Sequence, residues 1–291
     1  MNRKDFLQTL SLLPLAGYAA NATVMKHFND NAAASDRTPL LFIGHGSPMN
    51  GITDNVYSEA WKKLGQTLEP PKAILCVSAH WLTKGTYVTA LEEQRTIHSF
   101  SNFPKELFDV RYNVKGNPQL AKQTQELIKN TQIEFSHDWG LDHGAWTVIR
   151  RLYPEANIPV IQLSIDYSKP AEYHYQLGKQ LASLRRKGVL ILGSGNIIHN
   201  LYTTSNNAKP FDWAIEAKEK FNKLIADKNH TPLLKYQSLG EYANNAIPTP
   251  DHFFPLLYVL GLQEKDENVC FFNDDILSGS LSMTSLHIEK G

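Results

Sequence analysis

Histidine is the residue type through which this sequence points to chemistry. Three of the eleven histidines, His45, His80 and His199, come just after apolar, strand-like runs. They lie in the segments Gly44-His-Gly-Ser47, Ser78-Ala-His-Trp81 and Gly193-Ser-Gly-Asn-Ile-Ile-His-Asn200. The carboxyl ends of parallel strands converge on the ligand crevice of an open α/β sheet. We therefore expect these three imidazoles to meet at one edge of a sheet.

Two further histidines fit the same edge. His252 follows Thr249 and Pro250, which we expect to cap a helix and to take its first position, so that His252 falls in the first turn. His143 lies in a short loop between two tryptophans that is expected to form a wall of the site. The other six are expected to be surface or structural residues, although the loop of His98 is expected near the pocket: His27, His98, His137, His174, His230 and His287.

A metal site is the simplest chemistry for such a set. Imidazole is the commonest protein ligand for zinc, iron and copper, and sites with open positions typically use two or three protein ligands. Because a single loop histidine is usually structural, the signal comes from three histidines at successive strand ends. The positions alone therefore favour a metal site.

Several other enzyme classes lack their motifs here. Gly44-His-Gly-Ser47 after a strand resembles the oxyanion loop of an α/β-hydrolase, but Gly193-Ser-Gly195 has the wrong spacing for a G-x-S-x-G nucleophile elbow. The HExxH, Walker A and GxGxxG patterns are also missing from the sequence. A serine hydrolase, a zincin protease, a kinase-like NTPase and a nicotinamide dehydrogenase are all disfavoured.

The elements that must position the histidines alternate between strand-like and helix-like segments. Strands are expected at 40–43, 73–79, 86–91, 159–165, 188–192, 268–273 and 280–288, and helices at 55–67, 117–129, 144–153, 170–187, 212–227 and 250–260. Buried strands separated by helices indicate βαβ units, and the last two strands are close enough for an antiparallel pair. We predict the α/β class, with a mostly parallel central sheet and helices on both faces, in a single catalytic domain over residues 36–291.

Composition bounds the possible partners. The 291 residues include 29 Lys+Arg and 29 Asp+Glu, so the formal net charge is zero, and 42% are hydrophobic. These values fit a globular body rather than a disordered chain, and they argue against nucleic-acid or anionic-membrane binding through bulk charge. The two cysteines, Cys76 and Cys270, are too far apart in the chain for a zinc ribbon or a CxxC pair.

Residues 1–35 read as a signal-like segment followed by a linker. Arg3-Lys-Asp-Phe-Leu7 resembles a twin-arginine export signal in which the second arginine has become lysine. The apolar stretch that follows is too short and too interrupted to span a bilayer. Export to the periplasm and a cytoplasmic location are equally expected.

Taken together and in order, the histidine segments resemble the class III extradiol dioxygenases. The closest resemblance is to the bacterial 4,5-DOPA extradiol dioxygenase group, related to the catalytic subunit of protocatechuate 4,5-dioxygenase, and it runs from about Thr38 to about Ile288. It is carried by Gly44-His-Gly-Ser-Pro-Met-Asn50, Val77-Ser-Ala-His-Trp81, Trp139-Gly-Leu-Asp-His-Gly-Ala-Trp146, Pro159-Val-Ile-Gln-Leu-Ser-Ile-Asp166, Gly193-Ser-Gly-Asn-Ile-Ile-His-Asn-Leu201 and Pro248-Thr-Pro-Asp-His-Phe-Phe-Pro-Leu-Leu256.

The resemblance implies a role for each histidine. His45, His80 and His252 would bind one divalent metal, and His199 would be an acid/base near its natural pKa, with a fourth-ligand role as the alternative. His143 and Ser47 would face the substrate. Many class III members replace one histidine ligand with a carboxylate, so Asp251 is an alternative ligand. We favour instead a role for Asp251 as a stabilising charge at a helix N-terminus.

The activity implied is metal-dependent extradiol cleavage of a DOPA-like catechol by dioxygen to a muconic semialdehyde. Fe²⁺ suits that reaction, whereas Zn²⁺, which an all-histidine site also suits, has no accessible redox change. A zinc-dependent hydrolase of a small amide or ester and a non-enzymatic binding protein on the same fold both stay open. The expected partners are a small aromatic diol and O₂, with Trp81, Phe103 and Trp146 as walls of the site.

Overall fold

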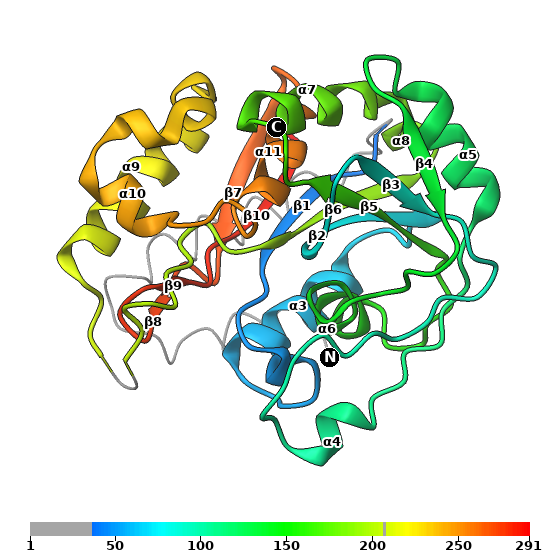
Figure 1. Ribbon diagram of the computed structural model, residues 1–291, viewed down its shortest axis with the longest axis horizontal. Helices are drawn as coiled ribbons and strands as arrows, with labels where there is room; N and C mark the ends of the chain where they lie inside the picture. Colours follow the sequence, from blue (N-terminus) through cyan, green and yellow to red (C-terminus); the bar gives the residue numbers. More distant parts are fainter. Residues whose placement is uncertain (1–36, 206–207) are drawn as a thin grey trace.

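An eight-stranded sheet forms the centre of the computed structural model (Figure 1), which describes residues 37–205 and 208–291. Its strands are β1 (Leu40–Gly44), β2 (Ala73–Thr83), β3 (Thr86–Thr89), β4 (Ile133–Ser136), β5 (Val160–Asp166), β6 (Val189–Gly195), β7 (Glu267–Phe272) and β10 (Ser285–Lys290). A separate two-stranded sheet pairs β8 (Ile276–Leu277) with β9 (Leu281–Ser282). The export prediction for residues 1–35 lies outside the described residues.

The strands run in the order β4-β3-β5-β2-β6-β1-β10-β7. The four strands β5, β2, β6 and β1 are mutually parallel, whereas β10 and β7 are antiparallel to each other and β10 is antiparallel to β1. At the other edge β3 pairs antiparallel with β5 and parallel with β4. The mostly parallel sheet and the antiparallel pair at the end of the chain are both confirmed.

Helices cover both faces of the sheet, as the sequence predicts. The helices of the described residues are α3 (Val56–Thr67), α4 (Lys105–Phe108), α5 (Pro118–Leu127), α6 (His143–Leu152), α7 (Ala171–Gln180), α8 (Ala182–Arg185), α9 (Asp212–Ala226), α10 (Glu241–Ala246) and α11 (Phe254–Gly261), with 3₁₀ turns η3 (Pro48–Gly51) and η4 (Thr231–Leu239). In Figure 1, α3 and α6 lie below the sheet and α7 and α11 above it.

Alternation along the strands divides the core between the two faces. Leu40 and Phe42 of β1 pack in one apolar cluster with the residues of α11, whereas Leu41 and Ile43 pack in the other with Trp61 of α3 and the apolar face of α6. Successive side chains of a strand point to opposite faces, so a strand buried on both faces needs a continuous apolar run. The uninterrupted runs at 40–43 and 73–77 therefore mark the middle of the sheet.

Some expected boundaries are wrong. The expected helix 250–260 begins at Phe254, and Thr249 and Pro250 lie in the turn before it rather than as its cap and first residue. The expected helix 170–187 divides into α7 and α8, and strand β4 and the segments η4 and α10 were not expected. Within the described residues, no helix has the length and apolar character needed to cross a membrane.

Candidate metal centre

Two histidines are fixed by the central strands themselves. His45 is the first residue after β1, and its backbone N–H donates to Gly195 O at the end of β6, 3.0 Å away. His80 was expected just past a strand end, but it lies inside β2, where pairing with β5 is interrupted between Val77 and Leu82. Irregular strand stretches of this kind occur next to active sites, where they redirect side chains.

His199 and His252 come from segments that pass the end of β6. His199 follows β6, and its backbone N–H donates to Ala246 O at 2.9 Å. His252 lies in the turn before α11, and its carbonyl accepts from Asn196 N–H at 3.0 Å. A Cβ atom on Gly195 would stand 2.1 Å from His252 O, so only glycine lets the two backbones approach this closely.

Three imidazoles come together at this edge of the sheet. His45, His80 and His252 each offer a ring nitrogen, and these atoms all lie within 4.8 Å of one another. The Nε2 atoms of His45 and His80 are 3.1 Å apart. Of the three histidines predicted to meet at strand ends, His45 and His80 belong to this trio, and His252 takes the third place.

The two remaining histidines of the predicted set flank this trio. The His199 ring stacks on His252 with centroids 3.5 Å apart and planes 5° apart, and the His143 ring lies 3.7 Å from that of His80. His80 and His199 are partly exposed, whereas His45, His143 and His252 are buried. Solvent therefore reaches the edge of this cluster at His80 and His199.

Two of the three rings are held at Nδ1 by a second polar group. His45 Nδ1 lies 3.0 Å from Ser194 Oγ, and His252 Nδ1 is hydrogen-bonded to the Asp251 carboxylate. The predicted role of Asp251 as a charge at a helix N-terminus is corrected, because α11 begins only at Phe254. Although burial raises the pKa of Asp251, hydrogen bonding to His252 and the charge of that ring hold it below its ordinary value.

Burial favours the neutral form of four of these imidazoles, those of His45, His80, His143 and His199. It lowers the pKa of His45 and His80 well below the ordinary value, and the neighbouring histidines lower both further. The pKa of His143 falls to about 4 and that of His199 to about 3, in both cases mainly through burial. The pKa of His199 is therefore lower than the near-natural value expected from the sequence. Neutral imidazole is the form that binds metals and accepts protons.

The donor set fits a divalent first-row metal. Three imidazole nitrogens this close together match the pattern of two or three histidine ligands plus open positions. A second group of donors, His199, Asp251 and His252, also lies within 4.8 Å. Since the Asp251 carboxylate already accepts from His252 Nδ1, the first group is the better metal site.

Known proteins resemble this chain in sequence and in fold. Residues 38–282 match the family model described as the catalytic LigB subunit of aromatic ring-opening dioxygenase. The 4,5-DOPA dioxygenase extradiol of Escherichia coli K12 is 43% identical over 265 residues, which are 89% of this chain and 97% of that protein. The 4,5-DOPA dioxygenase extradiol of Mirabilis jalapa is 35% identical over 234 residues, 77% of this chain and 86% of that protein.

A solved structure agrees with these sequence matches. The crystal structure of an uncharacterized protein from Escherichia coli K12 superposes with a TM-score of 0.74 and 40% identity, covering 87% of this chain and all of that one. The chain belongs to the LigB family of class III extradiol dioxygenases. It is a ring-cleavage dioxygenase. The family match therefore favours this activity over the two alternatives that the sequence left open, a hydrolase and a non-enzymatic binding protein.

The dioxygenase positions His143 through a buried network that sequence reasoning missed. Asp142, fully buried, caps α6 by accepting from Ala145 N–H, and it also accepts from the Ser78 hydroxyl at 2.6 Å and the Gln162 amide at 2.8 Å. The network joins β2, β5 and the first turn of α6, where His143 lies. A glutamine inside the apolar run of β5 was the sequence signal that a buried polar partner exists.

Ser47 of the dioxygenase is exposed at the start of η3. Its hydroxyl accepts from Met49 N–H at 3.3 Å and so caps this 3₁₀ turn. Buried Asn50 at the end of the same turn donates to His45 O at 3.0 Å. The turn therefore supports His45, and the substrate-binding role of Ser47 stays a prediction.

Aromatic side chains gather beside His143. Phe100, which the sequence reasoning did not single out, packs against the His143 ring with centroids 5.3 Å apart, and predicted Phe103 packs on Phe100. His98 lies 5.7 Å from Phe100, as its expected place near the site requires. Trp146 is instead a core residue whose Nε1–H donates to a backbone carbonyl.

Trp81, the third predicted wall, is also buried. It stacks on Trp139 with centroids 5.7 Å apart and planes 4° apart.

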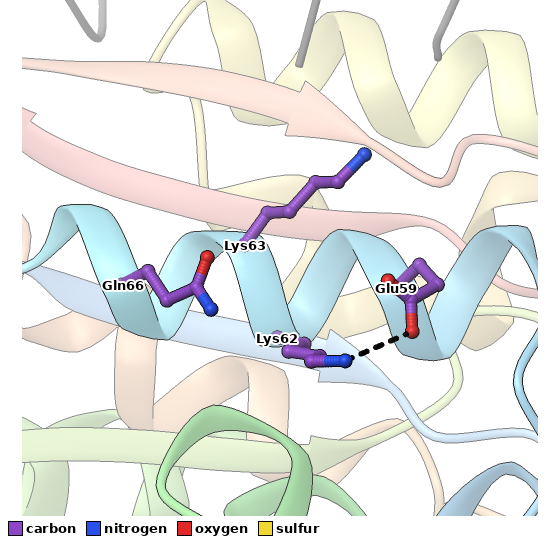
Figure 2. A pocket seen from close by; sticks show the side chains of 4 residues that line it. All are labelled: Glu59, Lys62, Lys63 and Gln66. Carbon is purple, nitrogen blue, oxygen red and sulfur yellow. Dashed lines mark ion pairs between the residues drawn. The ribbon is translucent and has the colours of Figure 1, made fainter. Parts of the chain in front are cut away.

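A separate hollow of about 400 Å³ lies along α3, lined by Glu59, Lys62, Lys63 and Gln66 (Figure 2). None of the five histidines lines this hollow, and we assign it no part in the chemistry of the dioxygenase.

Proposed function

We propose that this dioxygenase cleaves the ring of a DOPA-like catechol next to its two hydroxyl groups, using one divalent metal held by His45, His80 and His252. The observation that carries the proposal is the approach of these three ring nitrogens to within 4.8 Å, with His143 and His199 against the same rings. The names of the Escherichia coli and Mirabilis jalapa relatives support DOPA as the model substrate.

Fe²⁺ is the metal we propose for turnover. When bound, it supplies a redox-active Lewis acid through which electrons of the diol reach dioxygen, a role that redox-inert Zn²⁺ does not fill. His45, His80 and His252 would hold it, and a three-histidine ligand set is one that keeps coordination positions for substrate.

His199 is the proposed acid/base. Its neutral ring accepts a proton from a catechol hydroxyl and later returns it to the oxygen that leaves during ring opening. Stacking on His252 fixes the plane of the ring next to the ligands. His143, held by Ser99 Oγ at 2.8 Å from Nδ1 and by Phe100, would orient the diol on the other flank.

The overall reaction balances without a further reductant. One ring carbon–carbon bond breaks, both atoms of O₂ enter the product, and the catechol is oxidised to a muconic semialdehyde. With DOPA, the new aldehyde can condense with the amine of the same molecule and release water. The product should therefore absorb visible light, which gives a direct assay.

The test is anaerobic loading of the metal-free full chain with Fe²⁺ or with Zn²⁺, followed by oxygen and L-DOPA. We expect oxygen uptake and a new visible absorbance in the Fe²⁺ sample only. Metal binding without oxygen uptake across a panel of catechols would contradict the proposal, and turnover with Zn²⁺ in the absence of oxygen would replace it with a hydrolase.

A variant separates the role of His199 from metal binding. His199→Ala should keep the metal but lose ring cleavage by at least about 100-fold, the usual lower size of an acid/base contribution. Matched metal content in both proteins is the control. If the variant retains full turnover, His199 is not the acid/base.

A further inference from the structure

The tautomer of a metal-binding histidine decides which ring nitrogen carries the lone pair. A neutral imidazole has one N–H, so a ligand that binds through Nε2 must keep its proton on Nδ1. His45 Nε2 faces His80 Nε2 at 3.1 Å, and its Nδ1 faces Ser194 Oγ at 3.0 Å. The state of the Ser194 hydroxyl therefore bears on the donor that His45 offers.

Ser194 has only one hydroxyl hydrogen, and it donates that hydrogen to a group other than His45. Ser194 Oγ lies 2.6 Å from Gly144 O, a carbonyl that can only accept, so the hydroxyl hydrogen points there. Toward His45 the same oxygen must then accept, and Nδ1 must carry the proton. Ser194 is fully buried and His45 is 2% exposed, so the surrounding solvent does not compete for this pair.

We propose that Ser194 is a positioning residue that fixes the Nδ1–H tautomer and the ring plane of the metal ligand His45. The inference rests on the proposed metal site and deepens it. Ser194 is well suited to this because it lies on β6 opposite Ile43 of β1 on one side and Ser78 of β2 on the other. Its backbone is therefore held between the two strands that carry His45 and His80.

The Ser194 hydroxyl also connects His45 to the side of the site where substrate is proposed to bind. Gly144 follows His143 in α6, so one hydroxyl links the ligand to the turn that presents His143. A Cβ atom at position 144 would lie 2.6 Å from Ser78 Oγ and 2.8 Å from His80 Cδ2, so the close approach of α6 requires glycine. His252 differs, since a charged neighbour in its own turn, Asp251, holds its Nδ1.

The test compares full-length wild type with Ser194→Ala in two measurements that need no catalysis. Nitrogen NMR of ¹⁵N-histidine-labelled, metal-free protein reports the tautomer, with the His45 signal identified by its loss in His45→Ala. Competition with a chelator reports the affinity for Co²⁺ and Fe²⁺. We expect a loss of the pure Nδ1–H form and a fall in affinity of about 10- to 100-fold, as for other partners of metal ligands.

Two further variants make the comparison specific. Ser164→Ala removes another buried serine hydroxyl, one that accepts from Tyr87 N–H, lies 2.7 Å from Thr83 Oγ1 and, within the described residues, is hydrogen-bonded to no histidine, and it should leave the affinity within about twofold. Ser194→Thr keeps a hydroxyl on the strand and should recover the Nδ1–H form. Circular dichroism and thermal unfolding establish that each variant is folded.

An unchanged tautomer, or an unchanged metal affinity, in folded Ser194→Ala would overturn the proposal. An equal loss of affinity in Ser164→Ala would also overturn it, because the effect would then be general loosening of the sheet. The outcome is separable from that of the proposed function. A wild type that binds metal through His45 but opens no catechol would refute the reaction and leave the role of Ser194 intact.

Discussion

Two buried histidines, His45 and His287, differ in what surrounds them. His45 directly follows the parallel strand β1, whereas His287 lies on antiparallel β10, opposite Leu41 of β1. They are 2% and 1% exposed, and burial lowers the pKa of both. Yet the ring centroids of three other histidines lie within 6.3 Å of that of His45, while His287 Nε2 lies 3.7 Å from a carboxylate oxygen of Glu289. Burial alone favours the neutral form of an imidazole, whereas a candidate metal site also needs other imidazoles brought close by neighbouring segments.

Removing a ligand should have the largest effect. His45→Ala deletes one of three donors, so we expect the affinity for Fe²⁺ or Co²⁺ to fall by at least about 100-fold and ring cleavage to be lost. Chelator competition and oxygen uptake measure the two effects. His287→Leu is the matched control, a buried histidine of the same sheet, and should leave the metal affinity unchanged. Equal losses in the two variants would contradict the assignment.

Weakening the partner of a ligand should have the next largest effect. Asp251→Asn replaces the carboxylate that accepts from His252 Nδ1 with a neutral amide, so we expect the metal affinity to fall by about 10- to 100-fold. A complete loss of binding, matching His45→Ala, would instead identify Asp251 as a ligand in its own right. The comparison is made by chelator competition on both variants.

Sequence reasoning pointed to this cluster of histidines because its signal is local. The histidines at strand ends, the glycines beside them and the apolar runs of the central strands can all be read along the chain, and the sheet class follows from them. Partners of those histidines cannot be read in this way. Ser194 and Asp142 act through contacts to Gly144, Ser78 and Gln162 that depend on register and on the depth of α6.

The helix boundaries show the same division. Asn117 and Pro118 were predicted to begin a helix and do so, because the Asn117 side chain caps Leu120 N–H at 2.9 Å. Thr249 and Pro250 carry a similar local signal, but the chain there turns toward Asn196, the first residue after β6, before α11 begins. Tertiary contacts to the end of β6 override the local preference, and they are what places His252 beside His45.

A backbone change should test that placement. Gly195→Ala puts a Cβ atom 2.1 Å from His252 O, so we expect a loss of about 3 kcal/mol in unfolding free energy together with weaker metal binding. Urea unfolding and chelator competition measure these. In Gly85→Ala the Cβ contact is an ordinary 3.7 Å, and although φ is +89° the metal affinity should not change. A stable Gly195→Ala protein would show that His252 is not held by this contact.

The smallest expected effect concerns His287 and pH. Burial lowers its pKa to about 3 in the folded protein, against an ordinary value near 6.5, so between these pH values the unfolded chain binds the extra proton. Neutral His287 therefore stabilises the folded state above about pH 6.5, and this stabilisation is lost as the pH falls below that value. The loss in unfolding free energy amounts to about 2 kcal/mol at pH 5. Compared with wild type, His287→Leu should lose less stability between pH 7 and pH 5. Parallel curves for the two metal-free proteins would contradict this.

The most direct test of the metal centre is anaerobic titration of the metal-free full chain with Fe²⁺, followed by X-ray absorption at the iron edge. The expected result is a single Fe²⁺ per chain with imidazole nitrogen ligands, and loss of that binding in His45→Ala but not in His287→Leu. Failure to bind Fe²⁺, or an iron environment that His45→Ala leaves unchanged, would contradict a site built from His45, His80 and His252.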